Sequence, residues 1–380
     1  MSLFLITIFV LYSSLHLYLF MKMKAAFAFK TGSSILIVFL MAVMISSPVL
    51  VRLLEKQEFE LLARVTAYVG YTWMGLTFLF FSFSLIVDLY HLSVYVGDLV
   101  FRRSLSSLVL SSQSAFGIPL LITVAIAFYG YFEARQIRND TVVIESLKIP
   151  KEVGTLTIVQ ISDVHAGLIV RHERLKRIIR TVEKAKPDLV VSTGDLVDGQ
   201  IDNLRGLSDL LRTISPRYGK FAVTGNHEFY AGLSQALGFT EEAGFEILRG
   251  ESRGIAGIIN IAGVDDPTGW YFGLGEGVSE RALLSELPPD KYTLLLKHRP
   301  VVDGEALGLF DLQLSGHTHK GQIFPFTFIT RIFFPFEAGL VRLRDKAYLY
   351  TSRGSGTWGP PIRFMSPPEV TVIKLVHREG

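Results

Sequence analysis

The sequence of 380 residues contains no cysteine, so it has no disulfide framework and no thiolate metal ligands. It also has little excess charge, since 38 Lys and Arg residues face 35 Asp and Glu residues. Residues 1–140 carry that whole excess, with ten basic against seven acidic side chains, and residues 141–380 hold 28 of each sign. A balanced domain without a basic run argues against nucleic acid as a main partner.

Charged side chains are missing altogether from four long stretches near the N-terminus. These stretches are residues 1–21, 31–51, 65–87 and 104–132. Each is long enough to cross the hydrocarbon core of a bilayer, which takes ~20 apolar residues in a helix. The first stretch lacks the basic residues that precede the apolar run of a secretory signal, so we interpret it as a retained helix. The sequence thus predicts an integral, multi-pass membrane protein with an N-terminal bundle of about four transmembrane α-helices over residues 1–132, the last at 108–132.

The side of the membrane on which the rest of the chain lies is poorly marked. The basic residues of the connecting loops divide five against five between the two sides, so the positive-inside rule gives no clear answer. Lys22 and Lys24 directly follow the first span, and the first helix usually has the most influence on orientation. They favour an N-terminus outside the cytoplasm and, with an even number of spans, a C-terminal domain on the same outer side.

From about residue 141 the sequence changes to short apolar runs that end in polar residues or glycine. Five of these runs predict buried strands, at residues 155–162, 188–193, 221–224, 292–298 and 312–315. Between the first two, the apolar residues of segment 171–186 share one face of a predicted helix, which Pro187 ends. Strands that alternate with helices predict a layered α/β domain, here over residues 151–380, after a linker at 133–150.

Each of the five predicted strands ends at, or is directly followed by, side chains that can bind a metal ion. In chain order these are Asp163 and His165, Asp195 and Asp198, Asn226 with His227 and Glu228, His298, and His317 with His319. One such group alone is common in turns and on surfaces. Five in succession are hard to explain by packing, because acids and imidazoles buried together without a cation are costly to desolvate.

This order of motifs resembles the calcineurin-like metallophosphoesterase superfamily. D-x-H, G-D-x-x-D, G-N-H-E, a lone histidine and G-H-x-H occur in succession within residues 155–320. The later stretch SRGSGTWGPPIRFMSPPEVTVIKL is similar to the end of a bacterial subgroup whose members are often membrane-tethered. The resemblance implies an α/β domain built as a β-sandwich flanked by helices, with a dinuclear metal centre along one edge.

The resemblance also implies which residues hold the two ions. One ion would take Asp163, His165 and His319, the other Asn226, His298 and His317, and Asp195 would bridge both. Carboxylate, amide and imidazole ligands suit divalent ions such as manganese, iron or zinc. Two such ions ~3.5–4 Å apart form a clamp for in-line displacement at phosphorus and activate a bridging hydroxide. We therefore expect a metallophosphoesterase that hydrolyses a phosphodiester or diphosphate bond.

Two further residues of the motifs are expected to act beside the ligands. His227, next to Asn226 but not itself a ligand, is the candidate acid that protonates the leaving oxygen. Asp198 would orient His227 and stabilise its protonated form. Glu228 stands where the family commonly has an aspartate, and because this residue is not a ligand we expect the difference to have little consequence.

The substrate class is indicated by the apolar segment 323–338, which carries six phenylalanines. Core strands would explain this segment, and so would a flap that dips into the bilayer or holds an acyl chain. With the four spans, it favours membrane lipids as partners and a lipid-linked or envelope phosphate ester over a freely diffusing nucleotide. A specific alternative is the diphosphatase of lipid A synthesis that acts on UDP-2,3-diacylglucosamine, which needs a site facing the cytoplasm.

Two alternatives of another class are a non-catalytic binding platform in the membrane and a channel or transporter. A degenerate platform should have lost metal ligands or the acid histidine, and this sequence retains all of them. A conduction path is usually marked by ionisable side chains within the spans, and the charge-free stretches offer only His16.

Overall fold

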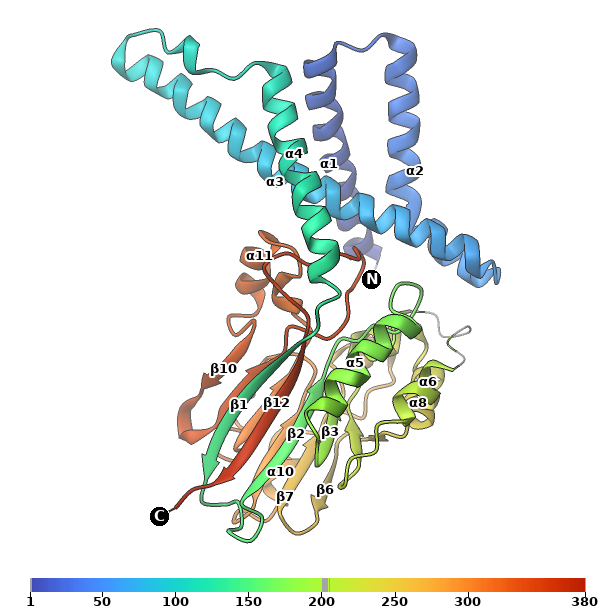
Figure 1. Ribbon diagram of the computed structural model, residues 1–380, viewed down its shortest axis with the longest axis vertical. Helices are drawn as coiled ribbons and strands as arrows, with labels where there is room; N and C mark the ends of the chain where they lie inside the picture. Colours follow the sequence, from blue (N-terminus) through green and yellow to red (C-terminus); the bar gives the residue numbers. More distant parts are fainter. Residues whose placement is uncertain (1, 200–203, 205, 380) are drawn as a thin grey trace. The chain divides into compact units, whose positions relative to one another are not determined.

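A computed structural model describes residues 2–199, 204 and 206–379, and the chain forms two compact units. The first unit comprises Met1–Phe132 and Gly359–Ile362, and the second comprises Glu133–Trp358 and Arg363–Gly380. Long helices make up the first unit (Figure 1), and two sheets with short helices make up the second.

Four helices of the first unit are long and apolar enough to cross a membrane. They are α1 (Ser2–Phe27), α2 (Thr31–Lys56), α3 (Glu60–Phe101) and α4 (Ser112–Glu133), with the 3-10 helix η1 (Ser106–Leu108) before α4. The third is longer than its predicted span of 65–87, since its 42 residues at ~1.5 Å each extend roughly 63 Å, about twice a hydrocarbon core. Asp88, which lies just beyond the predicted span, accepts hydrogen bonds from Tyr18 and Lys22 of α1.

His16 is buried in this unit and has a partner at each ring nitrogen. Trp73 of α3 donates its indole N–H to Nε2 at 2.8 Å, and Nδ1 lies 2.8 Å from the carbonyl oxygen of Tyr12. These contacts fix a neutral ring with its proton on Nδ1. His16 thus ties α1 to α3, which is a structural role.

Two six-stranded sheets form the second unit. The first has the order β1-β12-β2-β3-β4-β5, with bounds β1 (Arg138–Ser146), β12 (Glu369–His377), β2 (Thr155–Ile161), β3 (Leu189–Ser192), β4 (Lys220–Ala222) and β5 (Glu246–Ile247). The second has the order β10-β11-β9-β8-β7-β6, with bounds β10 (Gly339–Arg342), β11 (Tyr348–Thr351), β9 (Leu312–Ser315), β8 (Tyr292–Leu296), β7 (Ile259–Gly263) and β6 (Glu251–Ile255). Ile158 and Leu189 from one sheet share a buried core with Ile261, Leu294 and Leu314 from the other. The arrangement is the β-sandwich expected from the sequence.

Short helices and 3-10 turns connect the strands. They are α5 (His172–Lys184), α6 (Leu207–Arg212), α7 (Asn226–Ala231), α8 (Leu233–Glu242), α9 (Thr268–Phe272), α10 (Glu280–Ser285), η2 (His319–Gly321), α11 (Phe326–Phe333) and η3 (Arg344–Lys346). Figure 1 shows α5, α6 and α8 together on one flank of the sandwich. The buried face of α5 includes Leu175, Ile178 and Val182, as its apolar periodicity predicted.

The segment 133–150, predicted as a linker, contains a strand over half of its length. Arg138–Ser146 forms β1, which pairs in parallel with the whole of β12 from Arg138 opposite Glu369 to Ser146 opposite His377. β1 lies at the edge of its sheet, and Ile144 is its only fully buried residue. A strand covered on so little of its surface keeps the polar composition of a linker, so composition alone did not reveal it.

The five strands predicted to carry metal-binding residues are present as β2, β3, β4, β8 and β9. In the first sheet β2, β3 and β4 run parallel, and in the second β8 and β9 do so too. Parallel strands end at the same edge of their sheet, so the residues that follow them can meet there. This topology brings the five motifs of the sequence together.

Candidate metal centre

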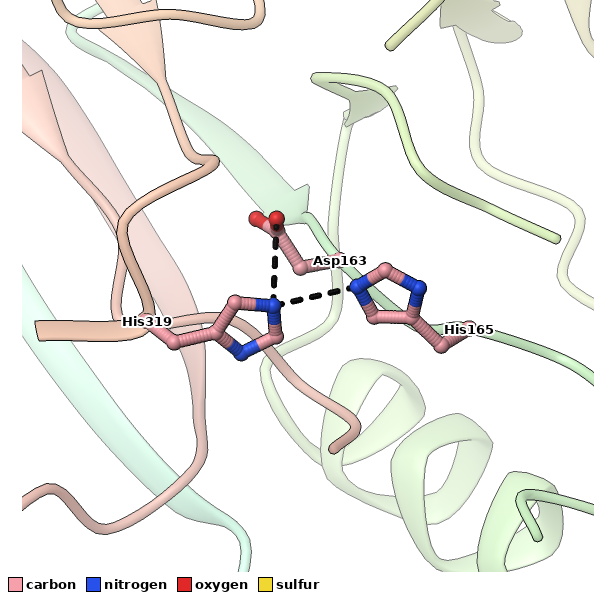
Figure 2. A group of neighbouring side chains, drawn as sticks. All are labelled: Asp163, His165 and His319. Atoms are coloured by element: carbon pink, nitrogen blue, oxygen red, sulfur yellow. Dashed lines mark hydrogen bonds and ion pairs between the residues drawn. The ribbon is translucent and has the colours of Figure 1, made fainter. Parts of the chain in front are cut away.

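One cluster of potential metal ligands joins the two sheets through Asp163, His165 and His319 (Figure 2). The Nε2 atoms of His165 and His319 lie 3.0 Å apart, and His319 Nε2 is 3.5 Å from Asp163 Oδ1. All three side chains are buried. Asp163 also accepts the backbone N–H of His317 at 3.0 Å, which fixes the G-H-x-H loop against the D-x-H loop.

A second cluster joins Asn226, His298 and His317. His298 Nε2 is 3.1 Å from His317 Nδ1 and 3.2 Å from Asn226 Oδ1, while its Nδ1 bonds to the carbonyl oxygen of Thr193 at 2.8 Å. That carbonyl can only accept, so the proton of a neutral His298 is on Nδ1 and the lone pair on Nε2 faces the cluster. The backbone therefore orients this ring for binding a cation.

Asp195 lies between the two clusters. Its Oδ2 is 3.8 Å from His165 Nε2 and 3.3 Å from His298 Nε2, and its Oδ1 accepts the backbone N–H of His227 at 2.8 Å. One carboxylate oxygen thus faces an imidazole of each cluster. The structure brings all seven predicted ligands to one edge of the sandwich, with Asp195 in the middle.

Five of the seven residues have a left-handed backbone conformation. The φ angles are 50° at Asp163, 51° at His165, 51° at Asp195, 72° at His317 and 48° at His319. Such a conformation costs ~1–3 kcal/mol for a residue with a side chain, and it persists only where the surroundings impose it. Close packing of the loops supplies part of that constraint. Gly316, which precedes His317, lies so near Ser162 that a Cβ on it would be 1.9 Å from Ser162 Oγ. The backbone is strained where the ligands are presented.

The protonation states of the imidazoles suit cation binding. Burial lowers the pKa of His165 to about 4 and that of His317 to about 3, and it lowers the pKa of His319 well below the usual value. Burial also disfavours the charged form of His298, but Asp195 outweighs it and raises the pKa of His298 to about 10. Three rings are thus neutral near pH 7, and in the fourth a cation would take the place of the proton.

The donor set fits a pair of divalent cations. Asp163 and Asp195 are almost completely buried, and burying carboxylates is costly unless a cation compensates their charge. Facing imidazole nitrogens about 3 Å apart also need a proton or a metal ion between them. Carboxylate, amide and imidazole donors without thiolate are typical of manganese, iron or zinc sites.

His227 and Asp198, the predicted acid and its orienting residue, lie beside the clusters. His227 Nδ1 is 3.0 Å from Asp198 Oδ1, and the His227 ring packs edge-on against the ring of His165, with centroids 4.6 Å apart. Burial disfavours the imidazolium, but Asp195 and then Asp198 outweigh it and raise the pKa of His227 to about 9. Asp198 therefore holds the Nδ1 side of the His227 ring.

Comparison with known proteins places the chain in a named family. The sequence profile of calcineurin-like phosphoesterase matches residues 156–321. An uncharacterised metallophosphoesterase of Aquifex aeolicus is 41% identical over 258 residues, which are 67% of this chain and 98% of that protein. This chain belongs to the calcineurin-like phosphoesterase family.

Two further relatives extend the comparison. An uncharacterised metallophosphoesterase of Campylobacter jejuni is 36% identical over 234 residues, 60% of this chain and 61% of that protein. A Danio rerio protein named transmembrane protein with metallophosphoesterase domain is 33% identical over 279 residues, 68% of this chain and 62% of that protein. The chain thus spans about three fifths of these two relatives. Family membership makes it a hydrolase of phosphoric esters with a candidate dimetal site.

Glu228 has a larger part in this phosphoesterase than the sequence suggested. Its buried carboxylate accepts four backbone N–H groups, from Gly225 at 2.6 Å, Asp195 at 2.9 Å, Leu196 at 2.8 Å and Val197 at 3.3 Å. It therefore ties the G-N-H-E loop to the G-D-x-x-D loop and holds the backbone of Asp195. The prediction that glutamate at position 228 has little consequence considered only metal ligands, and it overlooked these backbone contacts.

The C-terminal segment contributes residues to the phosphoesterase site that the sequence did not single out. The backbone N–H groups of Ser355 and Gly356 donate to the carbonyl oxygens of Ser162 at 2.7 Å and Asp163 at 3.0 Å. Arg363 is fully buried, and its Nη2 donates to Nδ1 of His319 at 2.9 Å. A guanidinium only donates, so this contact puts the proton of a neutral His319 ring on Nε2. No ligand chemistry in the sequence signalled Arg363.

Aromatic side chains line the phosphoesterase site. The rings of Tyr230 and Trp358 approach His227 edge-on, with centroids at 5.5 and 6.2 Å, and Phe334 approaches His317 edge-on at 5.0 Å. Tyr230 and Trp358 are about half exposed. Aromatic rings therefore lie beside His227 and beside His317 of the second cluster.

Proposed function

We propose that this phosphoesterase is a multi-pass membrane protein that uses two divalent cations to hydrolyse a phosphodiester or diphosphate bond in a lipid-linked substrate. The observation that carries the dimetal assignment is the position of Asp195 Oδ2, within 3.8 Å of His165 Nε2 and 3.3 Å of His298 Nε2. A ligand that bridges two ions must lie next to the other ligands of both, and Asp195 does so.

The residues divide into two sets around that carboxylate. One ion would be held by Asp163, His165 and His319, the other by Asn226, His298 and His317, and both by Asp195. When bound, such a pair acidifies water and offsets the charge that grows on the phosphoryl oxygens. Manganese, iron and zinc all suit these donors.

The proton for the leaving oxygen comes from His227. Asp198 binds its Nδ1 at 3.0 Å, which leaves Nε2 as the nitrogen that can reach a substrate. A positioned acid contributes ~10²–10⁴-fold to the rate of such a step. The side chain of His227 is 12% exposed, enough to be accessible without losing its fixed orientation.

Lipid linkage is supported by the four apolar helices and by the aromatic rings beside the centre. Phe334 beside His317 and Trp358 beside His227 would lie against the hydrophobic part of a lipid phosphate. A binding platform without catalysis is disfavoured because all seven ligands and the candidate acid are retained and lie together.

The test is hydrolysis by the purified full-length chain in detergent with added Mn²⁺. We expect cleavage of bis(p-nitrophenyl) phosphate and of a lipid-linked diphosphate, and a loss of ~10²–10⁴-fold in His227→Ala with both metal ions retained. His172→Ala, at an exposed histidine, is the matched control. Metal binding without any turnover would leave only the binding platform, and cleavage of the aryl ester alone would overturn the lipid linkage.

The orientation that we propose places the catalytic domain outside the cytoplasm, because Lys22 and Lys24 follow the first helix. A reporter fused after residue 380 would test it. Activity of a cytoplasmic reporter would contradict this orientation and would make a nucleotide-linked diacyl sugar the substrate to assay.

A further inference from the structure

The helix α11 exposes large apolar side chains on one face. Phe328, Ile329, Ile332 and Phe333 expose 59, 45, 76 and 71% of their surface. Their spacing of i, i+1, i+4 and i+5 puts them side by side, and the buried residue of the helix is Thr330. The segment 323–338 is therefore not made of core strands, and an exposed cluster of this kind marks an interaction site. We call these four residues the α11 face.

The α11 face is firmly attached to the metal centre. Thr327 donates to the carbonyl oxygen of Lys320 at 2.9 Å, and Arg331 pairs with Glu337 at 2.6 Å. The backbone carbonyl of Glu337 in turn accepts from Thr318 at 2.6 Å, between the two histidines of the G-H-x-H loop. Phe334, the residue after α11, lies against His317. Whatever covers the α11 face is therefore held beside the site.

The residues before α11 are hydrogen-bonded to the part of the chain that leaves the last apolar helix. Phe324 donates its backbone N–H to Phe364 at 3.1 Å, and the neighbouring Met365 donates its own to the side chain of Glu133 at 3.1 Å. Glu133 is the last residue of α4, and only residues 134–137 separate it from β1. If α4 crosses a bilayer, the surface of that bilayer is at Glu133.

We propose that the α11 face docks on the lipid bilayer, at the depth of the headgroups and first acyl carbons, and so holds the metal centre at the membrane surface. This inference rests on the membrane anchoring proposed above. Interfacial helices combine an apolar face with basic side chains, and Arg331 supplies the exposed cation on α11. A lipid phosphate at the surface would then be presented to the site without leaving the membrane.

The absence of cysteine allows a clean depth measurement in the full-length chain. Ile332→Cys reports the α11 face, Leu36→Cys in α2 reports the spans, and Leu147→Cys reports an exposed apolar position far from α11. Leu147 follows β1, and nine residues at ~3.3 Å place it roughly 30 Å from the start of that strand. Each variant is labelled with an environment-sensitive fluorophore, reconstituted in phosphatidylcholine vesicles and quenched either by doxyl-labelled lipid or by aqueous iodide.

We expect lipid quenching at residues 36 and 332 and iodide quenching at residue 147. Iodide quenching at 332 with lipid quenching at 36 would overturn the docking and leave the anchoring intact. A label at 332 shielded from both quenchers would also overturn it, in favour of a second copy or another protein. Without lipid quenching at 36, the anchoring itself fails and the docking with it. None of these results depends on turnover, so a failure of the proposed reaction is seen separately.

Discussion

The substitution Gly356→Ala tests whether the C-terminal segment positions the first metal cluster. Gly356 donates to the carbonyl oxygen of Asp163 at 3.0 Å. A Cβ at this position would lie 1.9 Å from the carbonyl oxygen of Val164 and 2.9 Å from that of Asp163. Both contacts are with backbone between the ligands Asp163 and His165, so no flexible side chain can move aside.

The expected loss of activity follows from how far the backbone must move to accommodate the new Cβ. Ordinary carbon–oxygen contacts begin near ~3.3 Å, so the backbone at Val164 or the segment at Gly356 must move by roughly 1.4 Å. Overpacking of this kind costs ~1–3 kcal/mol of stability. A misplacement of ~1 Å in a catalytic site lowers the rate ~10²-fold. We therefore expect a modest loss of stability with a ~10²-fold or greater loss of kcat/KM.

The assay is hydrolysis of bis(p-nitrophenyl) phosphate by the full-length chain, with metal content and thermal unfolding measured in parallel. Gly304→Ala is the matched control, because a Cβ there meets no atom within 4 Å. We expect the control to stay within ~0.5 kcal/mol of the parent in stability, with unchanged activity. A Gly356→Ala variant with unchanged kcat/KM and full metal content would refute the positioning role of this segment.

Three further predictions concern the surroundings of the site and the fold. Glu228→Gln leaves backbone N–H groups around Asp195 without an acceptor and should cost ~1–3 kcal/mol of stability and lower the metal affinity; unchanged metal titration would contradict this. Removing metal with EDTA should lower the unfolding temperature, since a metal at 100 times its Kd stabilises by ~2.7 kcal/mol; an unchanged midpoint would count against a site. Burial lowers the pKa of Lys220 from 10.5 to about 8 in the folded chain. Between these pH values the unfolded chain binds a proton that the folded chain has lost, so the free energy of unfolding should rise with pH. Unfolding measured across this range should show the rise in the parent and not in Lys220→Met.

The sequence predicts a strand correctly where every or nearly every residue of that strand is buried. The strands β2, β3, β8 and β9 are buried along almost their whole length, so each gives an uninterrupted apolar run. The edge strand β1 lacks that signal because most of its side chains are exposed. The charge-free stretch did not reveal the end of α3 either, because the helix continues beyond it to Phe101, past Asp88, whose bonds to Lys22 and Tyr18 are contacts between helices.

The residues of the candidate metal centre could be proposed from the sequence because their chemistry is local to each strand end. Asp195, for example, follows a buried strand within a motif of known spacing. The supporting contacts have no such signature, since they depend on distances between remote segments. Arg363 reaches His319 from 44 residues further along the chain, and Glu228 acts through backbone N–H groups that any residue type could supply.

The central claim is that seven side chains hold two cations with Asp195 between them. Metal analysis of the full-length chain after loading with Mn²⁺ and gel filtration tests it most directly, with Asp195→Asn beside the parent. The account predicts two ions per chain in the parent and the loss of at least one in the variant. No bound ion in the parent, or two in both proteins, would contradict it.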